Sequence, residues 1–307
     1  MRVARSLAAF SLPLLVTLAA CGGSPSDEPA AEQSPAEGFP VTVTDSRGEV
    51  TLETVPERVV SLSPSLTEIL FEVGAGEQVV AADEYSNHPP EAPTTDLSGF
   101  TPNVEAVVEY DPDLVVLSDD GGDITEQLEN LEVPTLLLPA AQTLEDTYSQ
   151  MELLGEATGN AEEGAAAADE LRDRIDDVVA GVEDDAAGLT YYHEIDAQLY
   201  SVTSDTFIGQ VYGLFGLSNI ADEAEDTAGG YPQLSAEFIV EQDPDLVFVS
   251  YPGGVEDVTG RPAFDSVTAV REGNVIELDA DTSSRWGPRV ADFAEDVAEA
   301  VEAARGE

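Results

Sequence analysis

Polar and apolar positions follow the same order in two distant stretches of the chain. The stretches are residues 103–118 (NVEAVVEYDPDLVVLS) and 235–250 (SAEFIVEQDPDLVFVS), which share nine of sixteen residues at an offset of 132 positions. In both, an amphipathic segment ends at Asp-Pro, because proline lacks an N–H and disfavours helical geometry at the residue before it. The apolar run that follows is too continuous for a half-exposed strand and predicts a buried parallel strand. Nine matches are more than a common helix-to-strand turn explains, so the repeat indicates two similar α/β lobes.

The pattern around the first copy predicts one complete lobe. Leu66, Ile69, Leu70 and Val73 recur at helical spacing, and Gly74 ends the segment. Alternating residues on both sides of positions 46–48 predict a hairpin. The elements predicted for this lobe are strands at 41–45, 49–53, 59–62, 79–82 and 134–138, and helices at 66–73 and 143–158.

The pattern after Gly159-Asn160 predicts a long helix and then a second lobe. In residues 161–182, Leu171, Ile175, Val178 and Val182 form one apolar stripe, and at 1.5 Å per residue this helix is about 33 Å long. That length is sufficient to pass from one lobe to the other. The elements predicted beyond it are strands at 189–195, 219–221 and 274–278, a helix at 206–215, and a terminal helix from 287 that buries Val290, Phe293, Ala294, Val297 and Val301.

These elements predict an α/β fold with two similar lobes on mostly parallel sheets, joined by one long linking helix. The predicted boundaries are 41–158 for the N-terminal lobe, 159–184 for the linking helix and 185–307 for the C-terminal lobe.

The N-terminal residues predict export. Arg2 and Arg5 precede the short apolar stretch Ser6–Ala19, which is too short to span a membrane and reads as a cleavable signal in residues 1–20. Leu-Ala-Ala-Cys resembles a bacterial lipobox, in which Cys21, the only cysteine, becomes the lipidated first residue. Residues 21–40 are rich in Pro, Ser, Ala and Glu, which predicts a flexible tether to the outer face of the cell membrane.

Composition excludes several classes of partner. The net charge is −52 and all eleven basic residues are arginine, so a basic patch for nucleic acid or an anionic membrane surface is excluded. We therefore expect the lipid anchor alone to hold the chain at the membrane. We also expect the chain to be a monomer. A solvated acidic surface explains most of the carboxylates, and their excess is consistent with solubility at high salt.

Few residues suggest catalysis or metal binding. No Gly-x-Ser-x-Gly elbow is present and no carboxylate pair stands out, so an exported enzyme is disfavoured, with neither catalytic residues nor a cofactor assigned. A zinc or manganese site needs several histidines, whereas the chain has only His88 and His193, one in each lobe. The acidic run at 119–123 lacks the spacing of a calcium loop.

The chain resembles the solute-binding lipoproteins of ABC importers, in the group that binds cobalamin, ferric siderophores or haem. The resemblance extends from about Val41 to Ala304, and it is carried by ERVVSLSPSLTEILFEVG, YSNHPPEA, NVEAVVEYDPDLVV, YPQLSAEFIVEQDPDLVF and RWGPRVADF. It implies a ligand cleft between the lobes, capture of a ligand there and delivery to a permease dimer. In cobalamin-binding members a glutamate on each lobe docks onto permease arginines, and the matching residues are Glu105 and Glu237.

The resemblance also implies which residues contact the ligand. Aromatic side chains on loops suit a large, flat, weakly charged molecule. Asp281 and Arg285 match polar residues that bind corrin side groups, and Trp286 lies beside them. The matching aromatic positions are Tyr85, Phe100, Tyr200 and Tyr231.

The ligand itself stays open between a corrinoid, a ferric siderophore and haem. Anionic siderophores and haem favour several basic residues in the cleft, and the match places only Arg285 there. The sequence therefore favours a corrinoid, with a neutral siderophore as the nearest rival.

Overall fold

The computed structural model describes residues 38–186 and 188–306. The predicted signal peptide, Cys21 and most of the predicted tether lie outside these residues. Within them, no helix combines the length and the apolar character that crossing a membrane requires.

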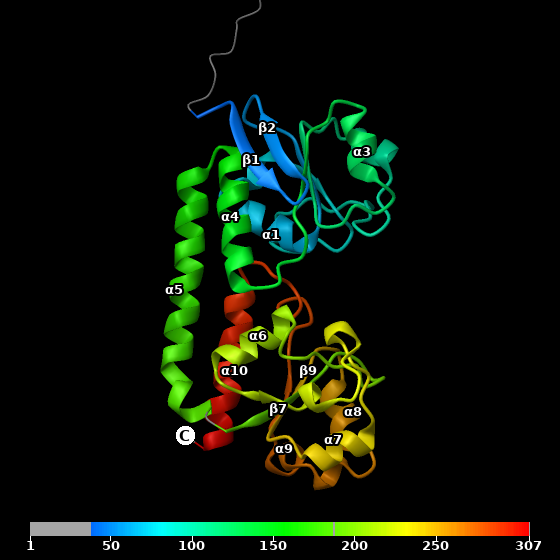
Figure 1. The fold of residues 1–307 in the computed structure, drawn as a ribbon, viewed down its shortest axis with the longest axis vertical. Coiled ribbons are helices and arrows are strands. Elements are labelled where there is room, and N and C mark those ends of the chain that lie inside the picture. The colour runs from blue at the N-terminus through cyan, green and yellow to red at the C-terminus, as the bar shows by residue number, and fades with distance from the viewer. Residues whose placement is uncertain (1–37, 187, 307) are drawn as a thin grey trace, which may run out of the picture. The chain divides into compact units, whose positions relative to one another are not determined.

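Two four-stranded parallel sheets form the framework (Figure 1). The sheet of the N-terminal lobe has the order β4-β3-β5-β6, and that of the C-terminal lobe has β8-β7-β9-β10, so in each sheet the strand that comes first along the chain (β3 or β7) is second in the order. The predicted fold class is confirmed. The strands are β3 (Val59–Leu62), β4 (Val79–Ala82), β5 (Leu114–Leu117), β6 (Thr135–Leu137), β7 (Thr190–Glu194), β8 (Ser218–Asn219), β9 (Leu246–Val249) and β10 (Val275–Glu277), with an antiparallel hairpin of β1 (Val41–Asp45) and β2 (Gly48–Leu52).

Helices connect and cover the strands (Figure 1). The α-helices are α1 (Pro64–Glu72), α2 (Val104–Val108), α3 (Ile124–Glu129), α4 (Leu144–Thr158), α5 (Ala161–Ala186), α6 (Phe207–Leu214), α7 (Ala236–Gln242), α8 (Gly254–Gly260), α9 (Thr268–Glu272) and α10 (Val290–Arg305). Short 3₁₀ turns lie at Gly76–Gln78, Ile220–Glu223, Ala228–Gly230 and Phe264–Ser266.

The repeated sequence forms the same structure twice, α2 followed by β5 and α7 followed by β9. Asp111 and Asp243, which precede the prolines, have φ angles of 50° and 48° and turn the chain out of each helix. Two residues later, Asp113 accepts the backbone N–H of Arg58 at 2.9 Å, and Asp245 accepts that of Thr190 at 2.9 Å. Each aspartate thus ties the repeat to the start of the first strand of the parallel sheet in its own lobe, β3 or β7.

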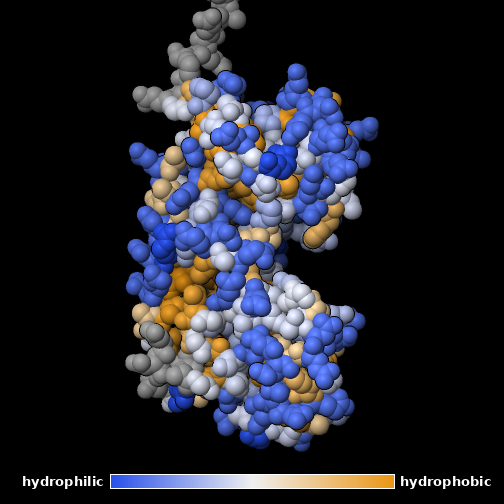
Figure 2. Space-filling view, viewed as in Figure 1, coloured by the Kyte–Doolittle hydropathy of each residue, from blue (hydrophilic) through white to orange (hydrophobic). Residues whose placement is uncertain are grey.

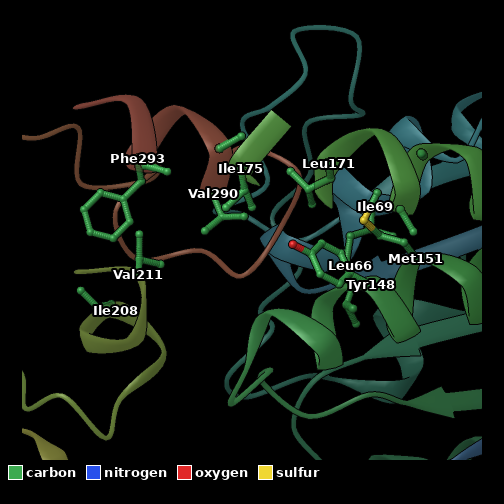
Figure 3. Packing of buried hydrophobic residues seen from close by; sticks show 14 of the residues in the cluster. Leu66, Ile69, Tyr148, Met151, Leu171, Ile175, Ile208, Val211, Val290 and Phe293 are labelled. Atoms are coloured by element: carbon green, nitrogen blue, oxygen red, sulfur yellow. The ribbon is translucent and has the colours of Figure 1, made fainter. Parts of the chain in front are cut away.

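One hydrophobic cluster continues from one lobe into the other. It includes the α5 stripe, in which Leu171, Ile175 and Val182 are buried, and the inner face of α10, which packs along α5. The two lobes therefore share this part of the hydrophobic core. Figure 3 shows how these buried side chains pack. They extend from α1 and α4 (Leu66, Ile69, Tyr148, Met151) through α5 (Leu171, Ile175) to α6 and α10 (Ile208, Val211, Val290, Phe293).

Several predicted boundaries shift, most of them by one or two residues. Helix α5 extends to Ala186, and α10 begins at Val290 rather than at Gly287. The strand predicted at 219–221 ends at Asn219, because the Asn219 side chain accepts the N–H of Ala221 at 2.9 Å and starts a 3₁₀ turn.

Candidate ligand-binding site

The four aromatic residues predicted to contact a ligand remain exposed. On the face shown in Figure 2 hydrophilic residues predominate, with a hydrophobic patch on the left at mid-height. Tyr85 is 53% exposed, Phe100 75%, Tyr200 37% and Tyr231 47%. In the described part of the chain, the other large hydrophobic residues of this kind are Leu131 and Leu214.

The first pocket, here called the N-lobe pocket, measures about 370 Å³ and lies at the carboxyl ends of β3, β4 and β5. Ligands of parallel α/β sheets generally bind at this edge. The rings of Tyr85 and Phe100 meet there edge to face, with centroids 6.0 Å apart. The lining residues include Ser63, Ser65, Asp83, Tyr85, Phe100, Ser118, Asp281, Arg285 and Trp286.

Close backbone packing positions Phe100. A Cβ atom on Gly99 would lie 2.7 Å from the Leu62 carbonyl oxygen, and one on Gly121 would lie 2.8 Å from that of Phe100. Both distances are too short for a side chain, so the two glycines let the Phe100 loop approach β3 and the turn after β5.

A second pocket, here called the C-lobe pocket, measures about 420 Å³. It is lined by the start of α6, by the 229–231 turn that carries Tyr231, and by residues 140–142 ahead of α4. Trp286 lines both pockets and is fixed by α4, because its Nε1 donates to Gln150 Oε1 at 3.2 Å and its carbonyl accepts from Thr147 Oγ1 at 3.1 Å. Tyr200 lies on the loop after β7 and lines neither of these two pockets.

Arg285 is held by the protein itself. Its guanidinium donates to Glu68 Oε1 at 2.7 Å, to Asn87 Oδ1 at 2.9 Å and to the Tyr85 carbonyl at 3.0 Å, and it pairs with Asp281 at 2.8 Å. The residue is 8% exposed. Arg285 is therefore a fixed part of the pocket wall, and its contact with a ligand stays a prediction.

Glu68 organises this network and was not singled out in the sequence. It is 3% exposed and accepts from Arg289 as well, at 2.6 Å and 3.0 Å. Hydrogen bonding to Glu68 raises the pKa of Arg289. A glutamate inside the apolar run of α1 was the available signal, since a buried charge needs a partner.

Asp83 is a second buried carboxylate beside the N-lobe pocket. It accepts the Tyr85 N–H at 2.9 Å and the Ser86 hydroxyl at 2.5 Å, so it fixes the loop that carries Tyr85. Burial raises the pKa of Asp83, while the Ser86 hydroxyl, the Tyr85 N–H and the Arg285 charge lower it.

Glu105 and Glu237 occupy equivalent places outside the pockets. Each is exposed in the first turn of its helix, α2 or α7. Asn103 and Ser235 cap these helices by accepting an N–H at 3.1 Å and 3.2 Å. The two carboxylates therefore have matching surroundings on the two lobes and are accessible to a partner.

The histidines do not form a metal site. His193 is buried, hydrogen-bonded to Tyr212 Oη at 2.8 Å and to Ser250 Oγ at 3.1 Å, and burial lowers its pKa to about 4. His88 is half-buried beside Pro89. Among residues 38–186 and 188–306, no three His, Cys, Asp or Glu side chains are grouped to hold a metal ion.

Two parallel-sheet lobes, one long linking helix and two pockets lined in part by aromatic residues are the features of a solute-binding protein. The chain belongs to the periplasmic binding protein family, whose model matches residues 59–282. This family consists of substrate-binding proteins of ABC transporters, among them binders of cobalamin, haem and siderophores, and its members are extracytoplasmic binding proteins rather than enzymes.

The relatives point in the same direction. The cobalamin-binding protein of Halobacterium salinarum is 33% identical over 296 residues, which cover 91% of this chain and 79% of that protein. The uncharacterized ABC transporter substrate-binding lipoprotein YvrC of Bacillus subtilis is 28% identical, covering 93% of each. The crystal structure of the vitamin B12-binding protein BtuF of Vibrio cholerae superposes with a TM-score of 0.71 at 26% identity, covering 82% of this chain and 99% of that one.

Proposed function

We propose that this protein is a lipid-anchored binding protein that captures a corrinoid and delivers it to an ABC permease. The observation that carries the ligand class is the chemistry of the two pockets, which combine aromatic surface with little positive charge. Arg285 is the one cation among the residues that line these pockets in the described part of the chain, and Glu68 and Asp281 neutralise it.

Charge distinguishes the candidate ligands. Haem and catecholate siderophores carry negative charges. In these pockets Arg285 is already paired with Glu68 and Asp281, so the negative charges of such a ligand would be buried without partners. A corrinoid presents a broad ring and neutral amide groups, which suit aromatic contacts from Tyr85, Phe100, Tyr231 and Trp286. The relatives named for cobalamin and vitamin B12 support the same choice. A neutral ferric hydroxamate meets the charge criterion equally well and is the second candidate.

A titration separates these ligands. The purified chain in detergent is titrated with cyanocobalamin, a neutral ferric hydroxamate, an anionic ferric catecholate and haem, with Trp286 fluorescence and calorimetry as readouts. We expect cyanocobalamin to bind tightly and to quench Trp286. Tyr85→Ala and Tyr231→Ala should each weaken binding by about 1–3 kcal/mol, the scale of lost aromatic contact.

Leu131→Ala is the control for these variants, because Leu131 is also exposed but lines neither pocket. Tight binding of the hydroxamate with none of cyanocobalamin would replace the corrinoid by a siderophore.

Glu105 and Glu237 are proposed to dock onto the permease. The double variant Glu105→Ala, Glu237→Ala should abolish corrinoid uptake and leave ligand affinity unchanged. Glu109→Ala with Glu241→Ala is a matched control, since these glutamates are also exposed and equivalent in the repeat. Uptake lost equally in both double variants would indicate a general charge effect rather than docking.

The proposed anchor is the lipidated Cys21. The lipoprotein YvrC supports it by similarity. Cys21→Ser should release the protein from membranes, as measured by fractionation and by incorporation of labelled lipid. Continued lipid incorporation in this variant would contradict the assignment.

A further inference from the structure

The N-terminus of α6 opens onto the C-lobe pocket. Thr206 caps the helix, because its Oγ1 accepts the Gly209 N–H at 3.0 Å and donates to the Thr203 carbonyl at 2.8 Å. Phe207 and Ile208 line the pocket, and their N–H groups have no carbonyl partner within the helix. These two donors lie at the positive end of the helix dipole, where an acceptor oxygen is favoured.

Thr203 adds a hydroxyl at the same place. The residue lines the C-lobe pocket, is 3% exposed, and its Oγ1 has no hydrogen-bond partner among the described residues. The hydroxyl faces the glycine turn of the pocket, since a Cβ atom on Gly230 would lie 3.6 Å from it. Because native proteins rarely leave a buried hydroxyl unpaired, an acceptor oxygen bound in the pocket would satisfy this one.

The charge around these donors restricts that partner. Asp205 is exposed and lines the pocket next to the helix start, and no lysine or arginine is among the lining residues. A carboxylate bound to the three donors would be repelled by Asp205. A carboxamide fits both features, because its oxygen accepts hydrogen bonds and its NH₂ group donates to a carboxylate.

We propose that Thr203 Oγ1 and the N–H groups of Phe207 and Ile208 form a subsite for a carboxamide of the ligand, with Asp205 selecting against a carboxylate. The subsite rests on the proposed function, since corrinoids carry carboxamides around the ring. It assigns to Thr203 and Asp205 a specificity role that the aromatic contacts do not provide.

The test uses near-isosteric changes at Thr203. Thr203→Val removes the hydroxyl and should weaken cyanocobalamin binding by about three- to tenfold, the range of one hydrogen bond. Because the hydroxyl has no protein partner, the same change should leave the midpoint of thermal unfolding equal or higher. Opposite effects on affinity and stability are not expected from a purely structural residue.

Ser201→Ala is the matched control. Ser201 lies two residues away, is fully buried and also lacks a hydrogen-bond partner among the described residues, but it does not line the C-lobe pocket. Its affinity for cyanocobalamin should equal that of the wild type. If Thr203→Val does not fold, Thr203→Ser and Thr203→Ala are compared, and only the serine variant should retain affinity.

A second measurement uses cyanocobalamin derivatives in which one peripheral amide is hydrolysed to the acid. At least one monoacid should bind the wild type weakly, and Asp205→Asn should recover part of its affinity. Wild-type binding of cyanocobalamin with no change in Thr203→Val, or equal binding of every monoacid, overturns the subsite alone. Failure of the wild type to bind cyanocobalamin overturns the proposed function.

Discussion

Each lobe buries a glutamate against arginine, but the two ion pairs differ in what they connect. Glu194, at the end of β7, is fully buried and accepts hydrogen bonds from both terminal nitrogens of Arg261 at 2.7 Å and 2.8 Å. Glu68 in α1 forms salt bridges with Arg285 and Arg289. Arg261 comes from the same lobe as its partner, 67 residues later, whereas Arg285 follows Glu68 by 217 residues.

This difference assigns different roles to the same chemistry. The Glu194–Arg261 pair closes a contact inside the C-terminal lobe, where Tyr192 and Tyr251 also donate to the carboxylate at 3.1 Å and 2.6 Å. The Glu68 pair instead holds the segment that carries Trp286 against the N-terminal lobe and so shapes both pockets. The first pair should govern stability, and the second should govern binding as well.

The largest expected effect is on the C-terminal lobe. Glu194→Gln leaves the Arg261 guanidinium without its charged partner, and breaking a buried ion pair in this way costs about 3–5 kcal/mol of unfolding free energy. Chemical denaturation measures the loss. Affinity for cyanocobalamin should stay within about twofold, because the loss is confined to the lobe interior. Glu237→Gln is the exposed control, and a comparable loss of stability there would show that the effect is not one of burial.

A pH effect also belongs to the C-terminal lobe. Burial lowers the pKa of His193 to about 4, so the folded protein keeps this imidazole neutral while the unfolded chain protonates it below its ordinary pKa of 6.5. The stability from His193 is therefore present above pH 6.5 and is lost as the pH falls toward 4. Between pH 8 and 5 the loss should be about 2 kcal/mol.

The measurement is the free energy of unfolding as a function of pH for wild type and His193→Gln. The variant should be less stable at pH 8 but show a smaller decline on acidification. His88→Gln, in the other lobe, should keep the wild-type decline. Parallel curves for wild type and His193→Gln would show that His193 does not contribute to the pH dependence of stability.

The N-terminal ion pair should show the opposite balance. Glu68→Gln removes the carboxylate charge that pairs with Arg285 and Arg289, and it loosens the segment that carries Trp286. We expect about tenfold weaker cyanocobalamin binding, or roughly 1.4 kcal/mol, with a smaller loss of stability than in Glu194→Gln. Glu72→Gln, on the exposed face of the same helix, is the control. Unchanged affinity in Glu68→Gln would leave the two ion pairs equivalent.

The sequence predicted most of the fold because its signals are local. Strands β3, β5 and β9 are fully buried and read as apolar runs, while α4 starts at a threonine cap and ends at Gly159. The short helices α3, α8 and α9 were missed, since five to seven residues carry too little periodicity. Strand β8 was predicted too long because the Asn219 side chain competes for the backbone.

The candidate site was less accessible to sequence reasoning. The aromatic positions came from resemblance, and the structure places Tyr85 and Phe100 together in one pocket with Tyr231 in the other. The pairing of Glu68 with Arg285 joins residues 217 positions apart, so no local pattern announces it. Thr203 is similar, because an unpaired hydroxyl is defined only by its folded surroundings.

The smallest expected effect tests whether the repeated aspartate contributes the same stability to both lobes. Asp113 and Asp245 are the same position of the repeat, and each accepts two donors from the start of the first strand in its lobe: the Glu57 and Arg58 N–H groups for Asp113, and the Thr190 N–H and hydroxyl for Asp245. Asp113→Ala and Asp245→Ala should each lower the unfolding free energy by about 0.5–1.5 kcal/mol. The double variant should show the sum, because the sites lie in different lobes.

Chemical denaturation of the two single variants and the double variant provides the measurement, and Asp111→Ala is avoided because its positive φ adds backbone strain. Equal single effects would mean that both lobes gain the same stability from this turn, in contrast to the two ion pairs. A loss confined to Asp245→Ala, whose hydrogen bonds are better shielded from solvent, would mean that exposure rather than the repeated geometry sets the value of this contact.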